Sequence, residues 1–200
     1  MRIAKIFKQA SGLAALGAAL FLAGCAQSPQ YLNVSPTVSS NLPQVGSGQA
    51  VTLATVDGRE SDVLGTRSGK RMSTDTISVP AYTLMPKLQQ QAETALRQMG
   101  FEPTSQAAEG RPSLTLTLTR LSYEKGEAQA MLDKAVLVAK LKAVVENQGS
   151  VYTGIYTAKR EQSYALTPNY EENNQMVTEL LGNALDRTFG DPQIGQLLAQ

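Results

Sequence analysis

The feature that most constrains the fold is a regular alternation of side chains in the second half of the chain. Residues 113–123 alternate leucine with threonine, and residues 136–145 place apolar side chains on one face and lysines on the other. The turn sequence Asn147-Gln148-Gly149 then leads into a third strand, from Val151 to about Tyr164. Successive side chains of a strand point to opposite faces, so this pattern predicts a sheet with one buried face. Its solvated outer face carries Thr115, Thr117, Lys140 and Lys142.

Two amphipathic helices are expected beside these strands. The first begins between Pro80 and Thr83, and Pro86 favours the later start because proline is tolerated only in the first turn. Gly100 followed by Phe101 is typical of its C-terminal end. Its apolar stripe consists of Leu84, Leu88, Ala92, Ala95, Leu96 and Met99.

The second helix is expected over residues 169–189, where Asn169 and Glu172 form a capping-box pattern. Asp191-Pro192 is typical of the start of a short final helix. A first strand over Val51–Val56 and a loose hairpin around residues 63–65 and 77–79 precede both helices. This order predicts an α+β fold: a small antiparallel or mixed sheet with two amphipathic helices packed on one face.

The N-terminus has the order of a secretory signal peptide. Three basic residues precede an apolar stretch over residues 12–23, which is too short to span a membrane. The stretch ends in Leu22-Ala23-Gly24-Cys25, which resembles a bacterial lipobox. The resemblance implies cleavage before Cys25 and attachment of acyl chains such as palmitate to it. The alternative is an ordinary signal peptide followed by a chance cysteine.

Three regions follow from this arrangement. Residues 1–24 are a cleaved signal peptide, residues 25–50 are a lipidated N-terminus and flexible tether, and residues 51–200 are a single periplasmic domain. The tether is rich in Pro, Ser, Gln and Gly, which is typical of an extended flexible arm. A short element around Tyr31–Val38 is a candidate for docking on the domain. An aspartate directly after the lipidated cysteine resembles an inner-membrane retention signal. This chain has Ala26 at that position, so the outer membrane is favoured.

Composition excludes several function classes. The chain has no His and one Cys, so Ser-His-Asp and Cys-His units, His-ligated metals and internal disulfides are impossible. Without residues 1–24 it carries 15 basic and 17 acidic residues, a formal charge of −2, which does not indicate a nucleic-acid binder. The single S-x-x-K match, Ser122 to Lys125, lies at a strand end and lacks its companion motifs. We therefore expect no enzyme, no cofactor and no metal.

Arg59 and Arg67 are candidates for a small anionic site. They belong to a polar, locally basic region that starts at the turn Asp57-Gly58-Arg59, and arginine makes bidentate contacts with carboxylate or phosphate. The structural alternative, which we favour, is a turn in which Asp57 bonds nearby backbone and the cations are solvated.

Tyr152 and Tyr156 share one strand face, with Gly154 between them. Exposed tyrosines stack on sugar rings or anchor a partner, which makes both residues candidates for ligand or partner contacts. The commoner alternative is a pair of tyrosines buried at a sheet edge or helix seam.

The chain as a whole resembles the YajG-type lipoproteins of Gram-negative bacteria. The resemblance rests on the lipobox ending in Cys25, on Val34-Ser35-Pro36-Thr37, on Val56-Asp57-Gly58-Arg59 and on the order of strands and helices through Phe189. It implies a lipid-anchored envelope protein and assigns a role to Cys25 alone.

Two functions remain as hypotheses. The first is a non-enzymatic lipoprotein of the outer membrane that faces the periplasm and contacts an unidentified envelope protein in assembly or maintenance. The second is a ligand-binding module for a cell-wall fragment, glycan or lipid. A third, an enzyme limited to carboxylate, Lys or Tyr chemistry, ranks last.

Overall fold

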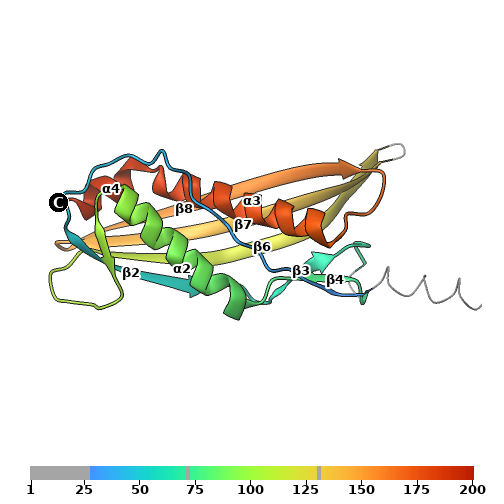
Figure 1. The fold of residues 1–200 in the computed structure, drawn as a ribbon, viewed down its shortest axis with the longest axis horizontal. Helices are drawn as coiled ribbons and strands as arrows, with labels where there is room; N and C mark the ends of the chain where they lie inside the picture. The colour runs from blue at the N-terminus through green and yellow to red at the C-terminus, as the bar shows by residue number, and fades with distance from the viewer. Residues whose placement is uncertain (1–27, 71–72, 130–131) are drawn as a thin grey trace, which may run out of the picture.

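The computed structural model describes residues 28–70, 73–129 and 132–200. Within them, a five-stranded sheet is covered on one face by three helices, and a three-stranded sheet lies at one end (Figure 1). The elements in chain order are β1 (Gln30–Tyr31), β2 (Ala50–Asp57), β3 (Val63–Thr66), β4 (Thr76–Ser78), α2 (Ala81–Gln98), β5 (Glu102–Thr104), β6 (Ser113–Gln129), β7 (Leu132–Asn147), β8 (Ser150–Tyr164), α3 (Tyr170–Phe189) and α4 (Pro192–Leu198).

The large sheet is mixed and has the strand order β5-β2-β6-β7-β8. β2 runs parallel to β5 and β6, while β6, β7 and β8 form an antiparallel meander. The leucines of β6 are buried, as the alternation predicts. Thr117, Lys142 and Ile155 stand side by side on the opposite face, where Lys142 and Ile155 are exposed. β6 and β7 extend beyond their predicted ends, β8 matches its predicted range to within one residue, and β5 was not expected.

The three helices lie on the same face of this sheet (Figure 1). α2 packs on β2 and β5, whereas α3 packs on β7 and β8 and α4 covers the end of β7. The apolar stripes of the helices and the inner side chains of the strands together form one core. The predicted α+β class and the placement of the helices on one face are confirmed.

The predicted helix ends are largely confirmed. Asn169 Oδ1 accepts a hydrogen bond from the Glu172 amide at 3.0 Å, and Glu172 Oε2 accepts one from the Asn169 amide at 2.8 Å. This capping box satisfies amides that the first turn of α3 leaves without partners. Asp191 caps α4 by accepting from the Gln193 amide at 2.9 Å.

The later start predicted for α2 is wrong. The Pro80 carbonyl already accepts the amides of Thr83 and Leu84, so the helix begins at Ala81 and Pro86 lies inside it. Proline lacks the amide that would reach back four residues, to the Tyr82 carbonyl. The Tyr82 side chain is 80% exposed, so this interruption lies toward the solvated side of the helix.

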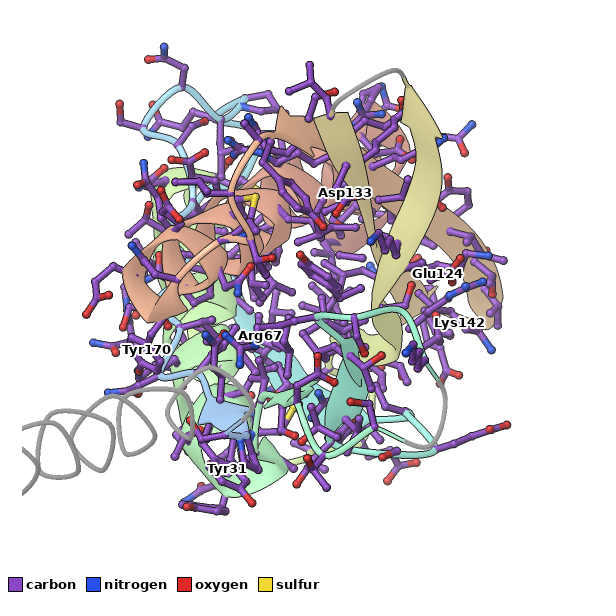
Figure 2. The ribbon with its side chains drawn as sticks, turned by 90° about the vertical axis from the view of Figure 1, so that its right-hand side faces the viewer. Tyr31, Arg67, Glu124, Asp133, Lys142 and Tyr170 are labelled. Atoms are coloured by element: carbon purple, nitrogen blue, oxygen red, sulfur yellow. The ribbon has the colours of Figure 1, made fainter. Side chains whose placement is uncertain are left out.

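The small sheet has the order β1-β4-β3 and lies beside β6 at one end of the molecule. It contains the predicted hairpin, since β3 and β4 are antiparallel, and β1 adds to β4 in parallel. Gly65 permits the close approach to β6, because a Cβ there would come within 1.9 Å of the Tyr123 carbonyl oxygen. We call the end of the molecule that is formed by β1, β3 and β4 the anchor end. Figure 2 looks onto this end and shows Tyr31, Arg67 and Tyr170.

Residues 28–49, which we call the N-terminal strap, run along the helical face of the domain (Figure 1). Leu32 and Val34 are each 1% exposed, and the amides of Val45 and Gly46 donate to the Met99 carbonyl. A Cβ on Gly182 of α3 would lie 2.9 Å from the Thr37 carbonyl oxygen, so glycine makes room for the strap. This corrects the expectation of a flexible arm up to residue 50. Docking around Tyr31–Val38 is confirmed, because alternate apolar side chains enter the core.

No helix among the described residues is both long enough and apolar enough to cross a membrane.

Candidate functional site

Arg59 is a structural residue. Its side chain is 3% exposed, and its Nε and Nη2 donate to the two carboxylate oxygens of Asp57 at 2.9 and 2.7 Å. Nη2 also reaches Asp62 at 3.2 Å, and Nη1 donates to the Val79 carbonyl at 3.1 Å. These hydrogen bonds from Arg59 hold the pKa of Asp57 below its ordinary value. The guanidinium is therefore neither solvated nor accessible to an anion.

Arg67 lies apart from Arg59, at the anchor end just after β3. Its Nη2 donates to the Ser28 carbonyl oxygen at 3.4 Å, and its amide donates to the Asp75 carbonyl at 3.0 Å. Its side chain lines a hollow of about 300 Å³ together with Ser68, Asp75, Lys125 and Thr167. The two arginines that the sequence grouped into one candidate site therefore do not share one.

Tyr152 and Tyr156 form a half-buried seam with α4. Their hydroxyls donate to the same oxygen, Asp191 Oδ2, at 2.7 and 2.6 Å. Gly154 leaves room for this arrangement, because a Cβ there would lie 2.1 Å from the Tyr156 hydroxyl. The structure brings both predicted tyrosines together, but in the seam arrangement rather than as exposed contacts.

The seam shifts the protonation equilibria of its members. Burial raises the pKa of Tyr156, and its hydrogen bond to Asp191 raises it further. For Asp191, burial acts to raise the pKa, but the hydrogen bonds from Tyr156, Tyr152 and the Gln193 amide outweigh it, and the pKa is lowered. The seam thus favours ionised Asp191 held by neutral tyrosines.

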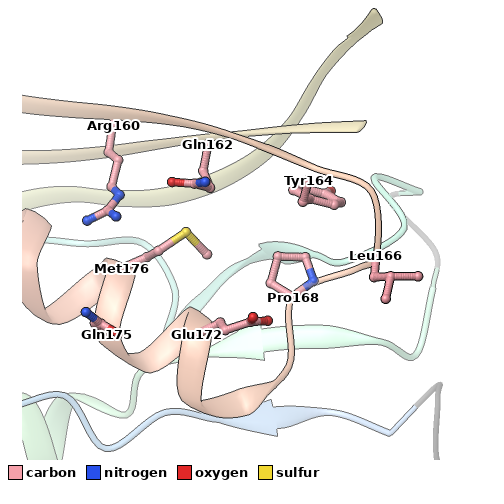
Figure 3. Close-up of a pocket in the computed structure, with 8 residues that line it drawn as sticks. All are labelled: Arg160, Gln162, Tyr164, Leu166, Pro168, Glu172, Gln175 and Met176. Atoms are coloured by element: carbon pink, nitrogen blue, oxygen red, sulfur yellow. The ribbon is translucent and has the colours of Figure 1, made fainter. Parts of the chain in front are cut away.

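A cavity of about 190 Å³ lies between the last part of β8 and the first turns of α3 (Figure 3). Tyr164 and Met176 contribute apolar surface, and Arg160 and Glu172 contribute charge. Arg160 is already paired with Glu179 of α3. The Tyr164 hydroxyl is buried without a hydrogen-bond partner among the described residues, as is that of Tyr123. Burial and the neighbouring Tyr164 raise the pKa of Tyr123. The phenol of Tyr123 is therefore held in its neutral form.

β8 forms an edge of the large sheet, with β7 as its one partner strand among the described residues. Its first nine residues, Ser150 to Ala158, carry no charge. Val151 and Ile155 point to the outer face and are 64% and 65% exposed. Exposed, uncharged edges are surfaces to which another strand can add, because their outer backbone groups have no partner strand.

Sequence reasoning missed the acceptor of the seam and the edge position of β8. Asp191 is 35 residues from Tyr156 in the chain, and its Asp-Pro pattern indicated a helix cap alone. The lack of charge over residues 150–158 was a signal for an exposed edge, but strand order is needed to interpret it.

The structure does not test the predicted lipidation. Cys25 lies outside the described residues. In the part of the chain that is described, no three His, Cys, Asp or Glu side chains come together in a way that could hold a metal ion.

The fold is a small α+β domain, and a family comparison assigns it. A family model described as uncharacterized lipoprotein matches residues 36–199, so the chain belongs to that lipoprotein family. The predicted resemblance to YajG-type lipoproteins is confirmed. A comparison with curated proteins found no match.

Several solved structures are similar in fold. A protein from Xanthomonas campestris shares 18% identity, with 84% of this chain and 99% of that chain covered and a TM-score of 0.47. A minor lipoprotein from Acinetobacter baumannii shares 16% identity over 77% and 92% of the two chains, with a TM-score of 0.42. The rare lipoprotein B from Shewanella oneidensis shares 15% identity over 74% and 92%, with a TM-score of 0.39.

Proposed function

We propose that this protein is a non-enzymatic lipoprotein of the outer membrane that acts through contacts with another envelope protein. Acyl chains on Cys25 anchor it, and the domain faces the periplasm. Membership of a lipoprotein family and the sequence Leu22-Ala23-Gly24-Cys25 support the anchor. Ala26 after the cysteine supports the outer membrane.

The observation that carries this proposal is the free edge of β8. Its charge-free half is nine residues long, which exceeds the commonest strand length of about five to six residues. Natural proteins commonly protect such edges with lysine or proline, and here the first charges come at Lys159 and Arg160. A partner strand that continues the sheet here would gain backbone hydrogen bonds, and the surface attached to it would cover Val151 and Ile155.

Photo-crosslinking in intact cells tests the proposal. A photoreactive amino acid replaces Thr153, which is exposed between Val151 and Ile155, in the lipidated protein. We expect one dominant protein adduct, identified by mass spectrometry. The adduct is lost with Ile155→Lys, because a charge on the edge opposes strand addition.

Lys142→Gln is the matched control. Lys142 is opposite Ile155 on β7, on the same face but one strand in from the edge. Both side chains are exposed, so neither change disturbs the core. We expect the adduct to persist in Lys142→Gln. Capture of lipid or cell-wall material without a stoichiometric protein would contradict the proposal.

That outcome would favour the second candidate function, a ligand-binding module. The cavity of Figure 3 and the buried Tyr164 hydroxyl support it. The cavity of about 190 Å³ is smaller than the usual ligand pocket of about 300–1,000 Å³. This cavity would therefore hold a fragment such as one sugar ring rather than a whole lipid.

A further inference from the structure

The strap fixes the point at which the chain leaves the domain. Gln30 and Tyr31 pair with Ile77 and Ser78 of β4, and the Leu32 amide donates to the Ser78 carbonyl at 2.8 Å. The Gln30 side chain is buried and accepts a hydrogen bond from Asn173 of α3 at 2.8 Å. With the bond between Arg67 and the Ser28 carbonyl, the chain is attached to the anchor end from Ser28 onward.

The short distance along the chain from Ser28 to Cys25 limits where the domain can sit. Three residues span at most about 11 Å even when fully extended. The flexible arm expected from the sequence, about 25 residues long, could have reached about 80 Å. Since the acyl chains on Cys25 would start at the bilayer surface, the anchor end cannot stand far from that surface.

The side chains around the exit point suit a bilayer surface. Leu166, in the loop between β8 and α3, is 86% exposed and lies at the edge of the group of residues that line the cavity in Figure 3. Its neighbour Thr167 lines the same hollow as Arg67, which places this loop beside the exit of the chain. Tyr31 is 66% exposed, and Lys70 of the β3–β4 turn is exposed. Leucine and tyrosine enter the headgroup region readily, and lysine pairs with lipid phosphates.

We propose that the anchor end rests on the bilayer that holds Cys25, with Leu166 and Tyr31 inserted at the level of the headgroups. The domain is elongated along β8 (Figure 1), so the end that carries the β7–β8 turn and α4 projects away from the membrane. The first half of β8 is then presented to a partner at a distance from the lipid. This inference rests on the proposed lipidation of Cys25.

Depth-dependent fluorescence quenching tests the inference. Leu166→Cys and Ser150→Cys each add one exposed thiol, which is labelled with an environment-sensitive fluorophore in the full-length, acylated protein. A strand of 15 residues, about 50 Å long, separates the two positions. The labelled proteins are reconstituted into vesicles of phosphatidylethanolamine and phosphatidylglycerol with brominated acyl chains. We expect quenching at residue 166 to exceed that at residue 150 several-fold, with a blue shift at 166 alone.

Flotation with the vesicles separates the two ways of failing. Protein that floats but is quenched equally weakly at both positions overturns the orientation and leaves the lipid anchor in place. Protein that does not float and carries no acyl mass overturns the proposed anchor, and the orientation with it. Unfolding midpoints equal to that of the unlabelled protein verify that both variants are folded.

Discussion

The two ends of the domain differ in how the side chains of β8 are bonded. At the end formed by α4, two tyrosines of β8 share the Asp191 carboxylate, and the buried Asn147 side chain donates to the Leu197 carbonyl at 2.9 Å. At the anchor end, Tyr164 of the same strand lies by a cavity with its hydroxyl unpaired among the described residues, and Leu166 is exposed. The first end is built for stability. At the second end, the Tyr164 hydroxyl and the Leu166 side chain make no comparable contribution to stability, and the buried strap holds that end instead.

If the anchor end is held by the strap rather than by contacts of β8, truncating a buried side chain of the strap should lower stability strongly. Leu32→Ala is the substitution with the largest expected effect. Leu32 is 1% exposed, so its truncation leaves a cavity and lowers the free energy of unfolding by about 3 kcal/mol. Urea denaturation measures it. Leu166→Ala is the matched control: its side chain is 86% exposed, and its effect stays within about 0.5 kcal/mol. Equal effects would mean that the strap does not pack on the domain.

Asp191→Ala should destabilise the end of the domain that is formed by α4. The substitution removes the cap of α4 and the common acceptor of two half-buried tyrosine hydroxyls. We expect a loss of about 2 kcal/mol, less than the sum of the three contacts because the carboxylate is partly hydrated. Denaturation of Asp191→Asn, which retains a capping oxygen, should give a smaller loss. If Asp191→Ala were as stable as the wild type, the seam would not contribute to the stability of the fold.

A pair of Tyr→Phe substitutions on β8 compares the two ends directly. Tyr156→Phe removes a hydrogen bond to a carboxylate and costs about 1 kcal/mol. Tyr164→Phe removes a buried hydroxyl that has no hydrogen-bond partner among the described residues, so it costs nothing or stabilises slightly. Thermal and urea unfolding of the two variants measure the difference. The reverse order would show that the Tyr164 hydroxyl is bonded and that the anchor end is the better satisfied one.

Acid titration gives the smallest expected effect. Because the folded-state pKa of Asp191 is below its ordinary value of 3.8, its ionised form stabilises the fold at neutral pH. This contribution is complete above the unfolded-state pKa and is lost as the pH falls through the lowered folded-state pKa. We therefore expect the stability difference between wild type and Asp191→Asn to shrink from about pH 5 to about pH 3. A difference that is constant or grows in acid would contradict the assignment.

The outcome for individual residues shows how far sequence reasoning reaches. The alternation at Leu114 and Leu116 and the capping box at Asn169 were predicted correctly, because each depends on neighbours a few residues away. The strap was assigned to a flexible tether because Pro, Ser and Gly outnumber its apolar residues. Leu32 and Val34 alternate within it, but the groove that receives them is made by segments more than 40 residues away.

The sequence by itself determined the long strands, the two long helices, the signal-like N-terminus and the family. These features follow from periodicity, capping and short motifs, each of which involves residues that are close together in the sequence. Tertiary structure decided which polar groups are neutralised and which surfaces stay open. It placed Arg59 between Asp57 and Asp62 against the Val79 carbonyl, joined Tyr152 and Tyr156 to Asp191, and left β8 at an edge. The burial of a polar side chain and the identity of its partner depend on segments that meet only when the core packs, so local sequence carries no direct record of them.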